Sequence, residues 1–153
     1  MSARRMLCVL LYLSLAPGLL YACATAVSTA PVASDQLSRP SDKVKVVYFH
    51  RPHRCEACIF AEQRISYIVN TFFEDELQSG KLTFEVYDLG GKNNAATASK
   101  YGAIGTQLFI NAIEDGVDHI RHIHEIWYWG CIDNESVFEE TVKNVIQKAL
   151  YGG

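Results

Sequence analysis

Residues 44–58 read VKVVYFHRPHRCEAC, and this stretch decides the fold. Its first six residues are β-branched or aromatic apart from one lysine, which predicts a buried strand over 44–49. A polar loop over 50–54 follows, and helical spacing begins after Cys58. Cys55 and Cys58 therefore stand at a helix N-terminus, where the dipole and free N–H groups favour a thiolate. Two thiols three positions apart predict a disulfide that opens and closes, which is a redox site.

The bulk composition is that of one globular domain with a removable segment, since the chain has 153 residues and is 49% hydrophobic. The formal net charge is −3, and it becomes more negative once Arg4 and Arg5 leave with a signal peptide. Basic residues are scattered, except for Arg51, His53 and Arg54 beside the cysteines. The chain lacks the electrostatic footprint of a nucleic-acid-binding protein, so we expect no nucleic acid partner.

Residues 1–23 predict a signal peptide. Residues 1–5 are positively charged, residues 6–20 are apolar, and Pro17-Gly18 breaks the apolar stretch near its end. A membrane-spanning anchor needs about 20 unbroken apolar residues, so the pattern favours a cleaved signal over a single-pass anchor. We expect the protein to be secreted across the inner membrane of a bacterium.

Two modes of cleavage remain open. Leu20-Tyr21-Ala22-Cys23 resembles the lipobox of bacterial lipoproteins, in which the cysteine carries lipid, although Tyr21 departs from the usual small residue. Ala22-Cys23-Ala24 also fits the A-x-A site of ordinary secretion. We expect either a periplasmic protein or one anchored to the cell envelope through lipid on Cys23. Residues 24–42, rich in Ala, Ser, Thr and Pro, predict a flexible tether.

From residue 43 onward the sequence predicts one α/β domain over 43–150. The expected elements are strands at 44–49, 82–87, 107–113 and 117–126, helices at 58–77 and 95–101, a hairpin turn at 114–116, and a last helix that begins at 133–135. The order is β-α-β-α-β-β-α. A crossover helix makes the first two strands parallel, and the hairpin completes a mixed four-stranded sheet flanked by helices.

This order, with C-x-x-C at the start of the first helix, resembles the thioredoxin fold over about residues 43–150. Residues 101–107, YGAIGTQ, also resemble the thioredoxin segment that leads to a cis-proline facing the disulfide, and Gln107 stands where that proline would be. Thioredoxin-like domains usually keep a buried acid on the first strand as a proton acceptor for the second cysteine. Here Tyr48-Phe49 occupies that neighbourhood.

The resemblance implies that Cys55 is the nucleophile and Cys58 the resolving cysteine. Arg54, and His53 when protonated, would stabilise a thiolate on Cys55, whereas the charge of Glu56 opposes it. These assignments predict thiol–disulfide exchange, in which an exposed thiolate attacks and a second thiol resolves the mixed disulfide.

The resemblance further implies that Thr106 and Gln107 bind substrate, because the corresponding loop holds the substrate backbone. Strand alternation predicts that Trp127 and Trp129 share one face and that one aromatic ring packs under the last helix. An exposed Trp129 near Cys55 would belong to a docking surface for client proteins.

Two other uses of the cysteine pair remain open. One is a permanent disulfide, which is natural in an oxidising compartment. The other is a zinc or copper site in which His50 or His53 joins Cys55 and Cys58. On the predicted fourth strand His122 and His124 share a face while His119 points to the other, a pattern more typical of a solvated surface than of a ligand set.

The favoured interpretation of Cys131 is a buried free cysteine near the start of the last helix. The other interpretation is that Cys131 serves as an alternative resolving thiol. Taken together, the sequence predicts an extracytoplasmic thiol–disulfide oxidoreductase acting on client proteins with an unidentified redox partner and no resident cofactor. A metal-handling module and a non-catalytic interaction domain are the alternatives.

Overall fold

The computed structural model describes residues 40–152. The predicted signal peptide at 1–23, Cys23 and most of the predicted tether lie outside it. Among the described residues, no helix is both long and apolar enough to cross a bilayer.

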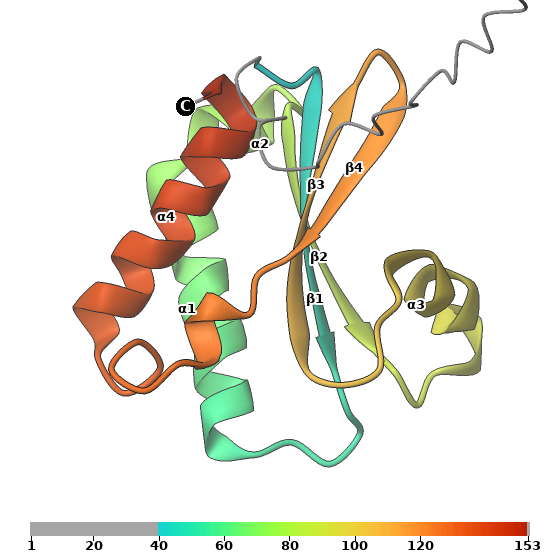
Figure 1. The fold of residues 1–153 in the computed structure, drawn as a ribbon, viewed down its shortest axis with the longest axis vertical. Helices are drawn as coiled ribbons and strands as arrows, with labels where there is room; N and C mark the ends of the chain where they lie inside the picture. The colour runs from blue at the N-terminus through green and yellow to red at the C-terminus, as the bar shows by residue number, and fades with distance from the viewer. Residues whose placement is uncertain (1–39, 153) are drawn as a thin grey trace, which may run out of the picture. The chain divides into compact units, whose positions relative to one another are not determined.

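A four-stranded sheet in the order β2-β1-β3-β4 forms the centre of the domain (Figure 1). The strands are β1 (Lys43–His50), β2 (Leu82–Asp88), β3 (Gln107–Glu114) and β4 (Val117–His122). β1 pairs in parallel with β2 and antiparallel with β3, which pairs antiparallel with β4. The predicted mixed sheet is confirmed.

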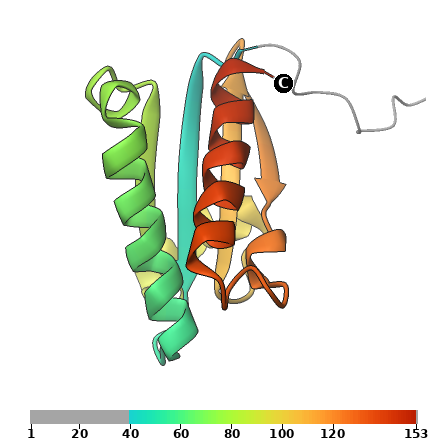
Figure 2. The same cartoon turned by 90° about the vertical axis from the view of Figure 1, so that its left-hand side faces the viewer.

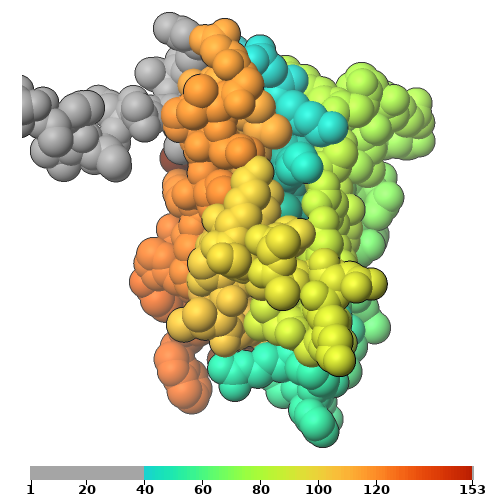
Figure 3. Space-filling view, turned by 90° about the vertical axis from the view of Figure 1, so that its right-hand side faces the viewer, coloured from blue at the N-terminus to red at the C-terminus, as the bar shows by residue number. Residues whose placement is uncertain are grey.

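Helices cover both faces of this sheet. α1 (Glu56–Phe72) and α4 (Glu135–Tyr151) lie together on one face, and α3 (Ala95–Tyr101) lies on the other (Figures 1 and 2). The remaining elements are the short helix α2 (Glu74–Gln78) and the 3₁₀ turns η1 (Lys92–Asn94) and η2 (Glu125–Trp127). Seen from the α3 side, the segment that follows β1 projects at one end of the domain (Figure 3). The predicted α/β order is therefore confirmed, with extra short turns.

β1 is buried on both faces because it is a central strand, and its alternation divides the core in two. Val46 and Tyr48 point into the main core between the sheet, α1 and α4. Val47 and Phe49 point into a smaller core under α3 that also contains Tyr101. The rings of Phe49 and Tyr101 lie 5.6 Å apart, so aromatic packing fastens the short helix α3 to the sheet.

The long helix predicted at 58–77 is broken at Phe73, and it begins two residues earlier. The backbone of Phe73 leaves the helical region at φ −134° and ψ 33°, while its N–H still binds Val69 O at 3.2 Å. This change of direction lets Phe73 remain in the main core. The predicted end at Ser79-Gly80 is confirmed, with Gly80 at φ 74°.

The fourth strand is shorter than the prediction of 117–126, which was wrong beyond His122. Ile123 and Ile126 are both fully buried in the main core. Their spacing of three would place them on opposite faces of a strand, whereas the chain leaves the extended conformation after His122 and enters the turn η2, which allows both to be buried. The predicted alternation of the tryptophans fails for the same reason, since Trp127 packs against the main core and Trp129 is exposed.

The hairpin turn predicted at 114–116 and the helix start predicted at 133–135 are confirmed. Asp115 and Gly116, at φ 51° and 78°, form the β3–β4 hairpin turn with both central residues left-handed, which matches the right-handed twist of the strands. Asn134 caps α4, and its side chain accepts a hydrogen bond from Val137 N–H at 3.2 Å.

Candidate functional site

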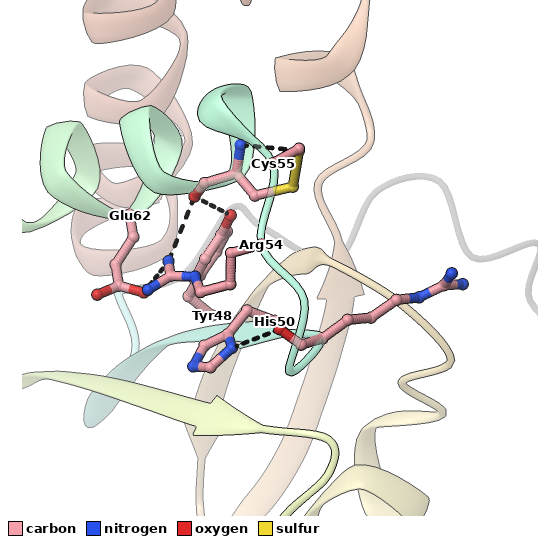
Figure 4. The surroundings of a disulfide bond; sticks show 7 residues. Tyr48, His50, Arg54, Cys55 and Glu62 are labelled. Carbon is pink, nitrogen blue, oxygen red and sulfur yellow. Dashed lines mark hydrogen bonds and ion pairs between the residues drawn. A yellow bond between two sulfur atoms is a disulfide. The ribbon is translucent and has the colours of Figure 1, made fainter.

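The cysteine pair lies just beyond the carboxyl end of β1, on the loop that leads into α1. Cys55 is the N-cap residue of α1 and is disulfide-bonded to Cys58, with a Cα–Cα distance of 5.1 Å (Figure 4). A neighbouring loop supports this segment at close range, since a Cβ on Gly90 would lie 2.4 Å from Pro52 Cγ. Only glycine fits at that position.

The two sulfurs have different surroundings. Cys55 is exposed, and its Sγ accepts a hydrogen bond from Cys58 N–H at 3.2 Å. Cys58 is half-buried within the first turn. A sulfur that accepts a backbone N–H at a helix N-terminus is stabilised when it becomes a thiolate. A partner can therefore reach the sulfur of Cys55, and the surroundings of this sulfur stabilise a thiolate. The sulfur of Cys58 is more enclosed.

The sheet order places this pair in a recognisable setting. β1 is central, it joins β2 through α1 in a parallel crossover, and an antiparallel hairpin and a covering helix follow. The cysteines occupy the start of the crossover helix, as the sequence predicted. The chain has a thioredoxin-like fold.

Comparison with known proteins finds similar solved structures at low sequence identity. No family model matches the chain, and no curated protein matches it. A solution structure of a thioredoxin from Thermus thermophilus is 15% identical, with 72% of this chain and 77% of that chain covered and a TM-score of 0.43. A Fasciola hepatica thioredoxin is 18% identical, with coverages of 68% and 82% and a TM-score of 0.41. An uncharacterised thioredoxin-like protein from Clostridium perfringens is 16% identical, with coverages of 79% and 93% and a TM-score of 0.37.

Beneath the disulfide, two side chains hold the backbone of the second cysteine. Tyr48 is fully buried, and its hydroxyl donates to Cys58 O at 2.8 Å. Arg54 Nη2 reaches the same carbonyl at 3.5 Å and lies 2.5 Å from Glu62 Oε2 (Figure 4). Burial raises the pKa of Tyr48 well above its ordinary range; the charge of Arg54 opposes this shift and that of Glu62 adds to it. Tyr48 therefore remains a protonated donor.

The residues predicted to tune the thiolate lie on the loop before α1. His53 is exposed. Arg54 is half-buried and directed toward Cys58 O and Glu62. The stabilisation of a Cys55 thiolate by Arg54 and His53 stays a prediction, and the ion pair adds Glu62 as a partner that the sequence analysis missed. The sequence position of Glu62 could have indicated this contact, because a residue seven positions after Cys55 lies on the same side of a helix.

The predicted substrate loop lies at the same end of the sheet. Gln107 opens β3 opposite Phe49, and its Oε1 accepts from Ile104 N–H at 2.8 Å and Gly105 N–H at 3.2 Å. Arg51 extends from the cysteine loop to Ile104 O at 3.5 Å. The side chain of Gln107 thus holds this loop from within.

The other residues that bear on substrate binding are half-buried or exposed. Thr106 is half-buried beside Gln107, whose Nε2 lies 3.4 Å from His122 Nε2. Trp129, on the segment between η2 and α4, is 96% exposed, and Ile104 is 84% exposed. Binding of substrate by Thr106, Gln107 and Trp129 stays a prediction, and Ile104 joins them as an exposed apolar side chain that the sequence analysis did not single out.

The histidines do not assemble a metal centre. His50 Nδ1 lies 3.0 Å from Arg51 O, in its own loop. The rings of His122 and His124 are 5.9 Å apart. Burial lowers the pKa of His122, and the charge of His124 lowers it further, whereas the charge of Glu125 acts in the opposite direction. Within residues 40–152, no group of three or more His, Cys, Asp or Glu side chains converges as a metal ligand set. The metal alternative therefore has no third ligand in the described part of the chain.

Cys131 is a free cysteine buried in the main core, with Sγ 3.7 Å from Thr141 Oγ1 of α4. The favoured prediction of a buried cysteine near the start of the last helix is confirmed. Its burial separates it from the exposed sulfur of Cys55.

Proposed function

We propose that this chain is a thiol–disulfide oxidoreductase that exchanges disulfides with client proteins through Cys55 and Cys58. The observation that carries the proposal is the position of Cys55, an exposed N-cap whose Sγ accepts the Cys58 N–H, in a thioredoxin-like fold. Such a sulfur combines access for a partner with stabilisation of the attacking thiolate.

Exchange begins from the reduced pair. The Cys55 thiolate attacks one sulfur of a client disulfide, which forms a Cys55–client bond and expels the other client sulfur as a thiolate that takes a proton from water. Cys58 loses its proton and attacks Cys55 Sγ, which forms the Cys55–Cys58 bond and expels the second client thiolate. The client gains two electrons and the cysteine pair loses two. The reverse sequence oxidises a client, and a dithiol or disulfide redox partner resets the pair.

Client proteins would dock at the sheet end that carries the disulfide. Ile104 and Trp129 offer exposed apolar surface, and the resemblance to thioredoxins predicts that the loop bordered by Thr106 and Gln107 faces the disulfide. The composition also supports export, with lipid on Cys23 as one form of attachment. Intact-mass measurement of the membrane-extracted protein distinguishes a lipid-bearing chain that begins at Cys23 from an unmodified one.

The deciding experiment measures the reduction potential of the Cys55–Cys58 pair against thiol buffers of glutathione and, at lower potentials, dithiothreitol, with alkylation and mass shift as the readout. A potential near about −270 mV indicates a reductant, and one near about −120 mV indicates an oxidant. A pair that stays oxidised below about −300 mV is a structural disulfide and overturns the proposal.

A matched pair of variants tests which sulfur attacks. In Cys58→Ser the remaining exposed thiol should form a stable mixed disulfide with oxidised glutathione, because no second thiol resolves it. In Cys55→Ser the half-buried Cys58 should form this adduct much more slowly. Equal rates of adduct formation would contradict the assignment of Cys55 as the nucleophile.

A further inference from the structure

We propose that Arg54 and Glu62 form a positioning pair that sets the ionisation of Cys58, the resolving cysteine, rather than that of Cys55. This inference rests on the proposed function. Arg54 Nη2 contacts both the carbonyl of Cys58 and the carboxylate of Glu62, at 3.5 and 2.5 Å. One guanidinium thus joins the backbone of the resolving cysteine to an acid on the next turns of α1 (Figure 4).

Partial burial of Arg54 and Glu62 strengthens the electrostatic effect of their charges on neighbouring groups. The side chains of Arg54 and Glu62 are 25% and 26% exposed, so they are less screened than surface charges. Arg54 Nε is also buried and has no hydrogen-bond partner in the described part of the chain. Tyr48 fixes the same carbonyl from below, so the Cys58 backbone and the pair keep a constant spacing.

The pair matters for the second half of exchange, in which Cys58 must lose a proton before it attacks Cys55 Sγ. A positive charge next to Cys58 favours its thiolate, and a negative charge disfavours it. With both partners present these effects largely cancel. Glu62 therefore offsets the guanidinium and keeps the reduced pair from being strongly stabilised.

The two partners should consequently have opposite effects when they are neutralised one at a time. Glu62→Gln leaves the charge of Arg54 unopposed, which stabilises the thiolate and hence the reduced pair. At pH 10, above the ordinary cysteine pKa of about 8.5, we expect the dithiol–disulfide equilibrium to shift about tenfold toward the dithiol, which is about 30 mV toward a more oxidising potential. Arg54→Gln leaves the carboxylate of Glu62 unopposed and should shift the equilibrium about as far toward the disulfide. The double variant should return close to the wild type.

The chain offers a matched control. Arg64 and Glu139 form an ion pair between α1 and α4 at 2.9 Å, with side chains 24% and 23% exposed. Arg64→Gln and Glu139→Gln remove charges of the same kind from a pair that contacts neither cysteine carbonyl in the hydrogen bonds described above. They should change the stability of the fold and leave the dithiol–disulfide equilibrium within about twofold of the wild type.

The experiment equilibrates the full chain and each variant with thiol buffers at pH 10, where a cysteine of ordinary pKa is ionised, after circular dichroism has verified folding. It then records the pH profile of alkylation of Cys58 in a Cys55→Ser background and of Cys55 in a Cys58→Ser background. Glu62→Gln should move the Cys58 profile to lower pH by more than the Cys55 profile. If Arg54→Gln fails to fold, the two alkylation profiles of Glu62→Gln decide alone.

Three results would overturn the inference: shifts of the same sign for Arg54→Gln and Glu62→Gln, shifts no larger than those of the Arg64 and Glu139 controls, or a Cys58 profile that does not move. These outcomes are distinct from a failure of the proposed function, which would appear as a wild-type pair that stays oxidised below about −300 mV.

Discussion

Replacing Tyr48 by phenylalanine removes the hydroxyl that binds Cys58 O and keeps the aromatic ring in the main core. The oxygen–oxygen distance is 2.8 Å, and a neutral hydrogen bond contributes about 1 kcal/mol net to stability. Arg54 still reaches the carbonyl at 3.5 Å, so the acceptor keeps a partner and the larger cost of an unsatisfied buried group does not apply. We expect Tyr48→Phe to lower the free energy of unfolding by about 1 kcal/mol at pH 7.

The same substitution has an opposite effect in alkali. Burial raises the pKa of Tyr48 above its ordinary value of 10.0, so above pH 10 the unfolded chain releases this proton while the folded protein holds it. The stability that Tyr48 supplies is therefore complete below pH 10 and falls as the pH rises past it. At pH 11 the loss is about 1.4 kcal/mol, which exceeds the hydrogen bond. The stability curves of wild type and variant should cross between about pH 10.5 and 11.

Urea unfolding of the oxidised proteins at pH 7, 9 and 11 measures this crossing. Tyr67→Phe serves as the control, because Tyr67 lies on α1 and is 46% exposed. At pH 7 the free energy of unfolding of Tyr67→Phe should lie close to that of the wild type, because the Tyr67 side chain reaches solvent. The reasoning would be refuted if the free energies of unfolding of Tyr48→Phe and the wild type were equal at pH 7, or if they differed by the same amount at pH 7 and pH 11.

Three further substitutions test other contacts. Gln107→Ala should accelerate hydrogen exchange at the two loop amides that Gln107 Oε1 accepts from, and unchanged exchange there would show that the loop is held otherwise. Asn134→Ala should cost about 1 kcal/mol in chemical denaturation by removing the cap of α4, and a loss below about 0.3 kcal/mol would argue against the cap. Phe138→Ala should cost about 3–5 kcal/mol, since its ring is fully buried, and a loss below about 1 kcal/mol would contradict its place in the core.

Local patterns predicted most of the fold. The run at 44–49 is a central strand because its apolar side chains serve two cores, and the hairpin turn at 114–116 needs two left-handed residues that Asp115-Gly116 provides. The cap at Asn134 likewise depends on neighbours in sequence. Patterns of this kind are visible without tertiary structure because each one is satisfied within a few residues.

The errors occur where tertiary burial decides the backbone. Ile123 and Ile126 suit a strand or a turn equally well by composition, and the main core selects the turn because both must point inward. The break at Phe73 has the same origin. At the candidate site, the sequence located the cysteines but not the contacts that Tyr48 and Glu62 make beneath them, because those contacts join a strand, a loop and a helix.

Because the two tryptophans have different surroundings, their intrinsic fluorescence reports on two different parts of the protein. Trp127 packs against the main core and Trp129 is 96% exposed, and the chain has two tryptophans in all. A Trp129→Phe variant emits only from the core, so the wavelength of its fluorescence follows unfolding. A Trp127→Phe variant emits only from solvent, so quenching of its fluorescence by iodide follows whatever covers the segment before α4.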